Sequence, residues 1–373
     1  MEHVRALGTT IGPRVAGTDA EKRAADYIAN QFKADGYDVE VMEFSFDGDR
    51  FRSAKLTLDA RTFEVTTAAN SSGGTISALS VFVGLGDGAG IGGRSLNGKI
   101  AVADRGTLTF GEKAENVVAA GAVGLVILNN QPGGVSADLR KLQLVPVVAA
   151  SGEDAGTLRA AAKAGKPLTI DSSAPSKTTA RNVIARPKAG AACNVLVGGH
   201  YDTVVSAPGA NDNASGAANV VELARAFAAD GLDDGLCFAA FSAEESGLYG
   251  SDALAQRFKS EGSLPKLMVN LDVTGIGDRV EVIGDRDYVT QTLAIAERLN
   301  IPAIRSQLPP NTGSDHLSFQ QVGVPILHFT SGEFVSIHSP ADVTKDVEEL
   351  ELDRIGDLAY AAITQLLPKV ARG

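Results

Sequence analysis

The sequence predicts an α/β protein: a mixed, mostly parallel sheet flanked by helices on both faces, interrupted by an inserted, mainly-β α+β domain. From about residue 180, apolar strand-like runs alternate with helix-like segments, which is typical of parallel strands joined by crossover helices. Before that, residues 52–175 are rich in Gly, Ser, Thr and Val and contain only short strand-like runs. A length of 373 residues suits two domains, or one large unit that carries an insertion.

The first expected elements are a helix and a strand. Thr18 to Glu21 reads as a capping box, which begins a helix that ends at Gly36, and the strand DVEVMEFSF follows. The compositional shift then separates a domain of residues 1–51 and 177–373 from an insert of residues 52–176. Within the insert the recognisable segments are SALSVFVGL, KIAVADRG, KAENVVAAGAVG and LVILNN.

The last region alternates strands with helices. One helix carries Val220, Leu223, Ala224 and Phe227 at helical spacing, so one of its faces is apolar. In such sheets, ligands bind beyond the carboxyl ends of the strands. The segments in chain order are NVLVGGHYD, ANVVELARAFAAD, LCFAAFSAEE, KLMVNLDVTG, TQTLAIAERLN and VPILHFTS.

Composition excludes several classes of function. The formal net charge is −11, and no Lys/Arg cluster offers an electrostatic footprint for nucleic acid. There is no apolar run of about 18 residues to span a membrane, and the first residues lack the layout of a signal peptide. A GxGxxG match at residues 88–93 precedes a strand rather than a helix, so a dinucleotide site is rejected. No HExxH or GxSxG motif occurs.

The chain has two cysteines, Cys193 and Cys237, each at the start of an expected buried strand. Two cysteines are too few for a disulfide framework or for a cysteine zinc site. We therefore expect a pair of inert thiols, and the sequence leaves open whether they pair.

Potential metal ligands gather where the predicted strands end. Because three strands finish in such residues, they should meet at one edge of the sheet. Zinc accepts imidazole nitrogen and carboxylate oxygen, and a carboxylate can bridge two ions about 3.5–4 Å apart. The candidates are His200, Asp202, Asp212, Glu244, Glu245, Asp272 and His338.

Five motifs in this order, HYD, GANDNASG, SAEESGLYGS, NLDVTG and IHSPADV, resemble those of the co-catalytic di-zinc aminopeptidases of the bacterial leucyl aminopeptidase and aminopeptidase Y type. The resemblance covers roughly residues 1–50 and 178–373. The intervening part resembles the protease-associated domain inserted in many of these enzymes, on SLNGKIAVADRG, KAENVVAAGAVGLVILNN and LVPVVAAS. The resemblance to the aminopeptidases implies a zinc exopeptidase-like fold that binds two Zn²⁺ per chain.

The resemblance also implies a role for each matched residue. His200 and Asp272 would bind one zinc, Glu245 and His338 the other, and Asp212 would bridge them. The peptide bond after the bridging aspartate is usually cis in this family, so a cis bond is expected there.

Other matched residues would act around the metals. Glu244 matches the general base, and Asp202 the acid that orients the imidazole of His200. From its position four residues after His338, rather than from the resemblance, Asp342 is expected to orient the second imidazole in the same way. Asp315 and His316, in GSDHLSF, match a segment near the site and are expected to lie behind the ligands or on the substrate side.

The implied activity is hydrolysis of the N-terminal residue from peptides with a free N-terminus, through a zinc-bridging water that Glu244 deprotonates. Two alternatives share the fold, a carboxypeptidase and a glutaminyl cyclase, and a non-catalytic receptor-like binding protein is a third. The insert is expected to restrict or guide peptide access. Secretion or a periplasmic location is expected from the family alone, and the oligomeric state stays open.

Overall fold

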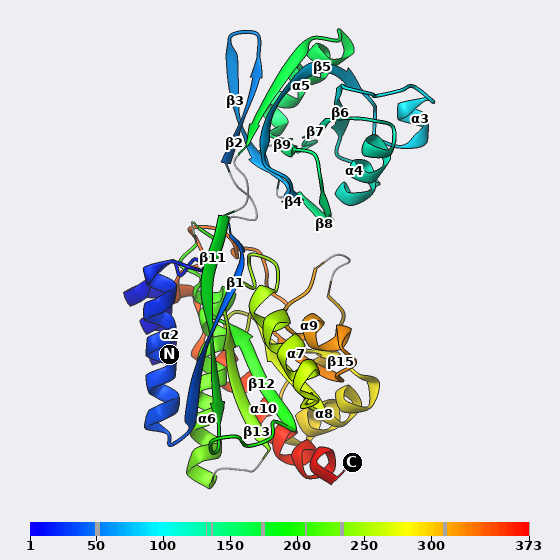
Figure 1. The fold of residues 1–373 in the computed structure, drawn as a ribbon. Helices are drawn as coiled ribbons and strands as arrows, with labels where there is room; N and C mark the ends of the chain where they lie inside the picture. The colour runs from blue at the N-terminus through cyan, green and yellow to red at the C-terminus, as the bar shows by residue number, and fades with distance from the viewer. Residues whose placement is uncertain are drawn as a thin grey trace. The chain divides into compact units, whose positions relative to one another are not determined.

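The computed structural model describes the chain except residues 49–52, 132, 136, 173–175, 206, 232–234, 309–311 and 373. The chain divides into two compact units (Figure 1). Unit 1 comprises Met1–Phe46 and Thr178–Gly373, and unit 2 comprises Asp47–Lys177. The insert predicted from the sequence, residues 52–176, differs from unit 2 by a few residues at its start and by one at its end.

Unit 1 is built on a mixed sheet of eight strands in the order β1-β11-β13-β12-β14-β17-β15-β16. The central strands β13, β12, β14 and β17 run parallel, and β11 and β15 join them antiparallel. The predicted mixed, mostly parallel α/β sheet is therefore confirmed. Its strands are β1 (Asp38–Gly48), β11 (Ser176–Arg186), β12 (Val195–His200), β13 (Leu236–Phe241), β14 (Leu267–Leu271), β15 (Val280–Gly284), β16 (Ala303–Arg305) and β17 (Ile326–Thr330).

Helices cover both faces of this sheet, and the side-chain alternation of β12 shows why. Val195 and Val197 belong to an apolar cluster with α2, α6, α8 and α10, whereas Leu196 points into a second cluster with α7 and α9. The helices are α1 (Glu2–Arg5), α2 (Asp19–Ala34), α6 (Gly216–Asp230), α7 (Tyr249–Glu261), α8 (Arg286–Leu299), α9 (His316–Gln321) and α10 (Glu349–Arg372), with short turns η1 (Ala6–Ile11), η2 (Ala210–Ser215) and η3 (Thr344–Asp346).

The capping box expected at the start of α2 is only half formed. The Thr18 side chain accepts a hydrogen bond from the Glu21 N–H. The Glu21 carboxylate is fully buried and accepts hydrogen bonds instead from the Arg181 N–H and the Tyr201 hydroxyl. This carboxylate therefore ties α2 to β11 and to the residue after β12, rather than closing its own helix end.

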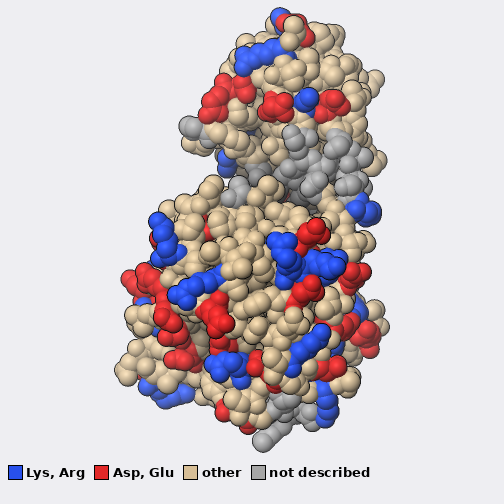
Figure 2. All heavy atoms as spheres, turned by 90° about the vertical axis from the view of Figure 1, so that its left-hand side faces the viewer, with Lys and Arg blue, Asp and Glu red and all other residues tan. Residues whose placement is uncertain are grey.

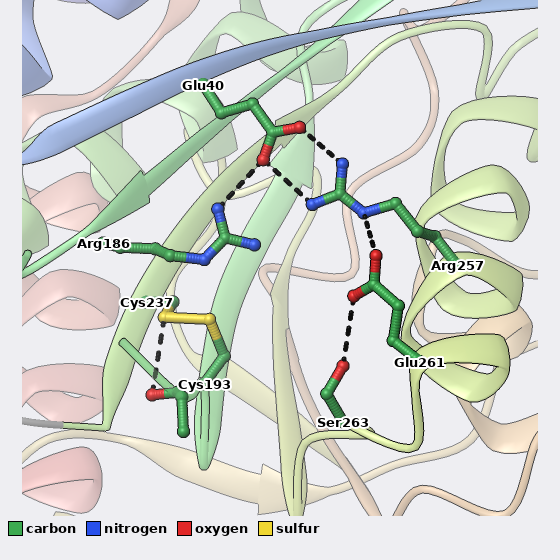
Figure 3. The surroundings of a disulfide bond; sticks show 8 residues. Glu40, Arg186, Cys193, Cys237, Arg257, Glu261 and Ser263 are labelled. Carbon is green, nitrogen blue, oxygen red and sulfur yellow. Dashed lines mark hydrogen bonds and ion pairs between the residues drawn. A yellow bond between two sulfur atoms is a disulfide. The ribbon is translucent and has the colours of Figure 1, made fainter. Parts of the chain in front are cut away.

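The expectation of two inert thiols is wrong, because Cys193 and Cys237 form a disulfide (Figure 3). Their Cα atoms are 5.3 Å apart, within the range that the bond needs. β12 and β13 are parallel neighbours, with Val195 opposite Leu236, and this pairing brings the two cysteines together.

An ion-pair cluster lies beside the disulfide. Glu40 of β1 accepts hydrogen bonds from Arg186 of β11 at 3.0 Å and from Arg257 of α7 at 2.9 Å (Figure 3). The hydrogen bonds from Arg257 lower the pKa of Glu40 to about 2, against the opposing effect of burial. The cluster connects the edge strand β1 to its neighbouring strand and to a helix.

Unit 2 is a closed barrel of seven strands in the order β10-β2-β3-β9-β7-β6-β5, so the general term mainly-β α+β understated its closure. β4 and β8 form a separate pair. The strands are β2 (Ser53–Leu58), β3 (Arg61–Thr67), β4 (Ala69–Ser71), β5 (Gly74–Phe82), β6 (Ile100–Asp104), β7 (Gly124–Leu128), β8 (Asp138–Gln143), β9 (Val147–Ala150) and β10 (Pro167–Ser172). The helices are α3 (Gly88–Ile91), α4 (Phe110–Ala119) and α5 (Gly152–Lys163).

The surface carries charges of both signs. On the face shown in Figure 2, acidic and basic side chains are interspersed over unit 1, and the basic ones do not gather into one patch. Within the described part of the chain, no helix combines the length and apolar character needed to cross a membrane.

Candidate metal centre

The site lies at the carboxyl edge of the parallel strands of unit 1. His200 is the last residue of β12, and Asp272 directly follows β14. Glu244 and Glu245 follow β13 by a few residues, and His338 lies in the loop after β17. The predicted gathering of strand ends therefore brings these side chains together, as expected for a parallel sheet.

Two groups of ligand atoms form at this edge. His200, Glu244 and Asp272 make one group, and Asp212, Glu245 and His338 make the other; within each group the ligand atoms lie within 4.8 Å of one another. The first group therefore includes Glu244, for which the resemblance implied a role as general base rather than as a metal ligand.

Asp212 lies between the two imidazoles. Its Oδ1 is 3.2 Å from Nε2 of His200, and its Oδ2 is 3.0 Å from Nε2 of His338. Each imidazole nitrogen also faces a second carboxylate, Asp272 at 3.3 Å and Glu245 at 3.1 Å respectively. One carboxylate thus presents one oxygen to each group, the arrangement required of a bridging ligand.

The side chains strongly perturb one another. Burial acts to lower the pKa of His200, but the charges of Asp272 and Glu244 hold it well above its usual value. Hydrogen bonds to Asp212 and Glu245 raise the pKa of His338 to about 11. Without metal ions, the surrounding carboxylates therefore favour the protonated form of both imidazoles.

The pKa values of the carboxylates shift in both directions. Burial raises the pKa of Glu244 well above its usual value and that of Glu245 to about 7. Burial also acts to raise the pKa of Asp212, but hydrogen bonds from the two histidines lower it. A buried group of like charges is unstable unless cations or protons neutralise it.

The donor set fits divalent cations. Asp272 Oδ1 and Glu245 Oε1 are buried and accept no hydrogen bond from the described residues. Imidazole nitrogens and carboxylate oxygens are ligands that zinc binds, and one cation in each group would satisfy these oxygens and neutralise the cluster. The residues present therefore fit a pair of metal ions.

Asp202 connects His200 to the general-base candidate. Its Oδ1 lies 3.6 Å from Nδ1 of His200 and accepts a hydrogen bond from the Glu244 N–H at 3.1 Å. The expected orienting acid is therefore beside the ring it should orient, and it also holds the backbone of Glu244.

The segment around Asp212 is fastened to the end of β14. The Asp212–Asn213 peptide bond is cis, as the resemblance implied. Asn213 Oδ1 accepts hydrogen bonds from the N–H groups of Gly216 and Val273, and its Nδ2 donates to the Leu271 carbonyl. This asparagine therefore fixes the segment that carries Asp212 relative to the end of β14, a role that sequence reasoning missed.

Asp342 has a different partner from the one expected. Its carboxylate accepts hydrogen bonds from the N–H groups of Asn211 at 2.7 Å and Asp212 at 3.0 Å. It therefore holds the backbone of the segment that carries Asp212, and among the described residues we find no contact between Asp342 and the ring of His338.

Asp315 and His316 are buried, and the charge of Asp315 acts on Glu244 and His200. Burial raises the pKa of Asp315 to about 7 and lowers that of His316 to about 4. The His316 ring stacks on His328, whose pKa burial lowers to about 3. His328 is buried in β17, and it also lines the cavity beside the two ligand groups.

Three residues at the site have left-handed backbone conformations that non-glycine residues seldom adopt. They are Ala243 with φ 59°, Val273 with φ 54° and His338 with φ 59°. Such residues persist only where the surroundings enforce them, and they concentrate at functional sites. Each of the three is a site residue or the direct neighbour of one.

A cavity of about 260 Å³ opens beside both ligand groups. Its wall combines the side chains of both ligand groups with apolar side chains and with residues of the loop before α9. Its lining comprises His200, Asp212, Glu244, Glu245, Asp272, Val273, Leu308, Thr312, Gly313, Ser314, His328, Thr330, Phe334, Ile337 and His338.

Residues 182–363 match the model of peptidase family M28, and residues 58–158 match that of the PA domain. Aminopeptidase YwaD of Bacillus subtilis (strain 168) is 31% identical over 390 residues, which include 97% of this chain and 83% of the relative. Among solved structures, an aminopeptidase from Aneurinibacillus sp. strain AM-1 has a TM-score of 0.80 and 31% identity, covering 98% of this chain and 92% of the other.

The zinc aminopeptidase BSAP from Bacillus subtilis has a TM-score of 0.81 and 29% identity, covering 98% of this chain and 93% of the other. These likenesses extend over nearly the whole chain, including the insert. The chain therefore belongs to peptidase family M28.

Proposed function

We propose that this protein is a metal-dependent aminopeptidase whose active site is the centre at the edge of the unit 1 sheet. The relatives that resemble it over almost its full length are aminopeptidases by name, and one is a zinc enzyme. We propose unit 1 as the catalytic domain and unit 2 as the inserted protease-associated domain. The substrates would be peptides with a free N-terminus.

The position of Asp212 carries the proposal of two metal ions per chain. One of its oxygens faces His200 and the other faces His338, and each imidazole is paired with a further acid. We assign His200 and Asp272 to one ion and Glu245 and His338 to the other. When bound, the ions would supply Lewis acidity, which polarises a carbonyl and makes water a stronger acid.

We assign Glu244 as the general base. It lines the cavity, and its backbone N–H is held by Asp202. Burial raises its pKa, and a raised pKa suits a carboxylate that must first take a proton from water and then give it to the leaving amine. Asp202 would meanwhile keep the His200 ring in place.

The metal count is tested by elemental analysis of the purified protein. We expect two zinc ions per chain in the wild type, and loss of both in Asp212→Asn, because that residue serves both groups. Asp357→Asn, on the solvent-facing part of α10 away from the site, is the matched control and should keep both ions. A wild type that binds one ion would contradict the bridging role.

The reaction class is tested by cleavage of leucyl-p-nitroanilide beside its N-acetylated form, with and without chelator. Cleavage of the free-amine compound alone, abolished by chelator, is the expected result. Cleavage of neither by protein that carries two zinc ions would favour the carboxypeptidase alternative. Cleavage of both would exclude recognition of the free amine.

The disulfide supports an oxidising compartment, such as the periplasm or the exterior of the cell. Structural disulfides persist in such environments and are rare in the cytosol of mesophiles. Cys193 and Cys237 are both buried, which suits a permanent bond. Fractionation of the native source, followed by thiol labelling of the denatured protein, would test this; a cytoplasmic enzyme with two free thiols would refute it.

A further inference from the structure

Arg14 is the largest side chain that is completely buried in the described part of the chain. It lies before α2 and outside all five sequence motifs. A buried guanidinium is costly unless its N–H groups find acceptors. Its contacts therefore indicate what the residue does.

The guanidinium connects two segments of the metal centre. Its Nε donates to the Tyr201 carbonyl at 2.6 Å, its Nη1 to the Pro208 carbonyl at 2.8 Å and its Nη2 to the Gly209 carbonyl at 2.8 Å. Further bonds from Nη1 run to the carbonyls of Leu7 and Gly12, both at 3.0 Å. All of these acceptors are neutral main-chain oxygens.

Two of these segments carry proposed ligands. Tyr201 stands between His200 and Asp202, and Gly209 comes three residues before Asp212. A Cβ atom at Gly209 would lie 2.3 Å from Thr203 Cγ2, 2.6 Å from the Asp212 carbonyl oxygen and 3.0 Å from Arg14 Nη2, so only glycine fits beside the guanidinium. The hydrogen bonds of the Arg14 guanidinium thus connect the backbone next to His200 with the backbone that leads to Asp212.

We propose that Arg14 is a positioning residue that fixes His200 relative to Asp212 and thereby sets the affinity of the centre for its metal ions. This inference rests on the proposed metal site. Arg14 and Asp342 act on opposite ends of one segment: the arginine holds the carbonyls of Pro208 and Gly209, and the aspartate holds the N–H groups of Asn211 and Asp212.

The shape of the guanidinium, rather than its charge, makes the contribution. Burial lowers the pKa of Arg14 to about 10, so it remains a cation at neutral pH. A cation near a site for cations opposes metal binding by simple repulsion. A planar fork with five donors can hold several carbonyls at fixed angles, and a lysine ammonium cannot.

The test measures Zn²⁺ dissociation constants by competition with a chromophoric chelator, on metal-stripped protein of full length. The variants are Arg14→Lys, which keeps the charge, and Arg14→Met, which removes it. Arg257→Lys is the matched control, because that arginine pairs with Glu40 and Glu261 and contacts no residue of the site in the described part of the chain. Circular dichroism checks that each variant is folded.

We expect both Arg14 variants to weaken Zn²⁺ binding by about 10- to 100-fold, as other residues behind metal ligands do, and the control to match the wild type. Wild-type affinity in Arg14→Lys, or tighter binding in Arg14→Met, would overturn the inference in favour of a purely electrostatic role. Failure of both variants to fold would assign Arg14 to global stability and also overturn it. A wild type that binds no Zn²⁺ would instead overturn the proposed function on which the inference rests.

Discussion

The disulfide makes a quantitative prediction about stability. Cys193 and Cys237 are 44 residues apart, and the chain between them carries His200, Asp202 and Asp212. A closed loop of this length lowers the conformational entropy of the unfolded chain. In the chain-entropy treatment, this raises the free energy of unfolding by about 4 kcal/mol near room temperature. Because both cysteines are buried, alanine is the substitute that leaves no unpaired polar group behind.

The assay compares Cys193→Ala/Cys237→Ala with the wild type by urea unfolding, followed by circular dichroism with chelator present to remove any contribution of bound metal. We expect the free energy of unfolding of unit 1 to fall by about 4 kcal/mol at most, since strain and residual structure in the unfolded chain reduce the effect. Reducing the wild-type bond in denaturant should reproduce the loss. A double variant with the midpoint and slope of the oxidised wild type would refute the reasoning.

Three further predictions concern the metal centre. Glu244→Gln should keep both zinc ions by elemental analysis and lose about 10²- to 10⁴-fold in turnover of leucyl-p-nitroanilide, because it removes only the proton acceptor; retained turnover would contradict this. Zn²⁺ should bind more tightly as pH rises, because His338, with a pKa of about 11, and Glu245, with a pKa of about 7, must release protons to the solvent when they bind metal; a pH-independent affinity in chelator competition would argue against these ligands. In metal-free protein, burial keeps the His316 ring neutral down to its pKa of about 4, whereas the same ring in the unfolded chain becomes protonated below pH 6.5. The free energy of unfolding should therefore fall as the pH is lowered from 6.5 to about 4. His316→Phe should remove this loss in urea unfolding at a series of pH values, and an unchanged pH dependence would contradict the buried neutral ring.

The sequence predicted the parts of the fold that follow from periodicity. Alternation of apolar runs and amphipathic segments located β12, α6, β13 and β14, because each of these elements has the hydrophobic pattern of its own class. Closure of the unit 2 barrel was not predictable in this way, since pairing between its first and last strands leaves no periodic signal in either strand.

The candidate site also has one part that the sequence could predict and another that it could not. Residues placed at strand ends, such as His200 and Asp272, could be found from order and chemistry alone. The contacts that hold them could not, because they join positions far apart in the sequence: Glu21 has the spacing of a capping box, yet it serves Tyr201, and Asp342 serves the backbone of Asp212. Arg14 carries no local signal at all, and only its burial reveals it.

The points where unit 2 interrupts unit 1 have a consequence for how this protein can change over evolution. The chain leaves unit 1 through β1 and returns through β11, and these strands are neighbours in the sheet (Figure 1). Within unit 2 the first and last strands are also paired, with Ala54 of β2 opposite Ser172 of β10. In the connectivity of the unit 1 sheet, the whole of unit 2 therefore stands where a short turn between β1 and β11 would otherwise be. Residues can be gained or lost inside the barrel without sliding β1 against β11, so the sheet that carries the candidate ligands is insulated from the length of the insert.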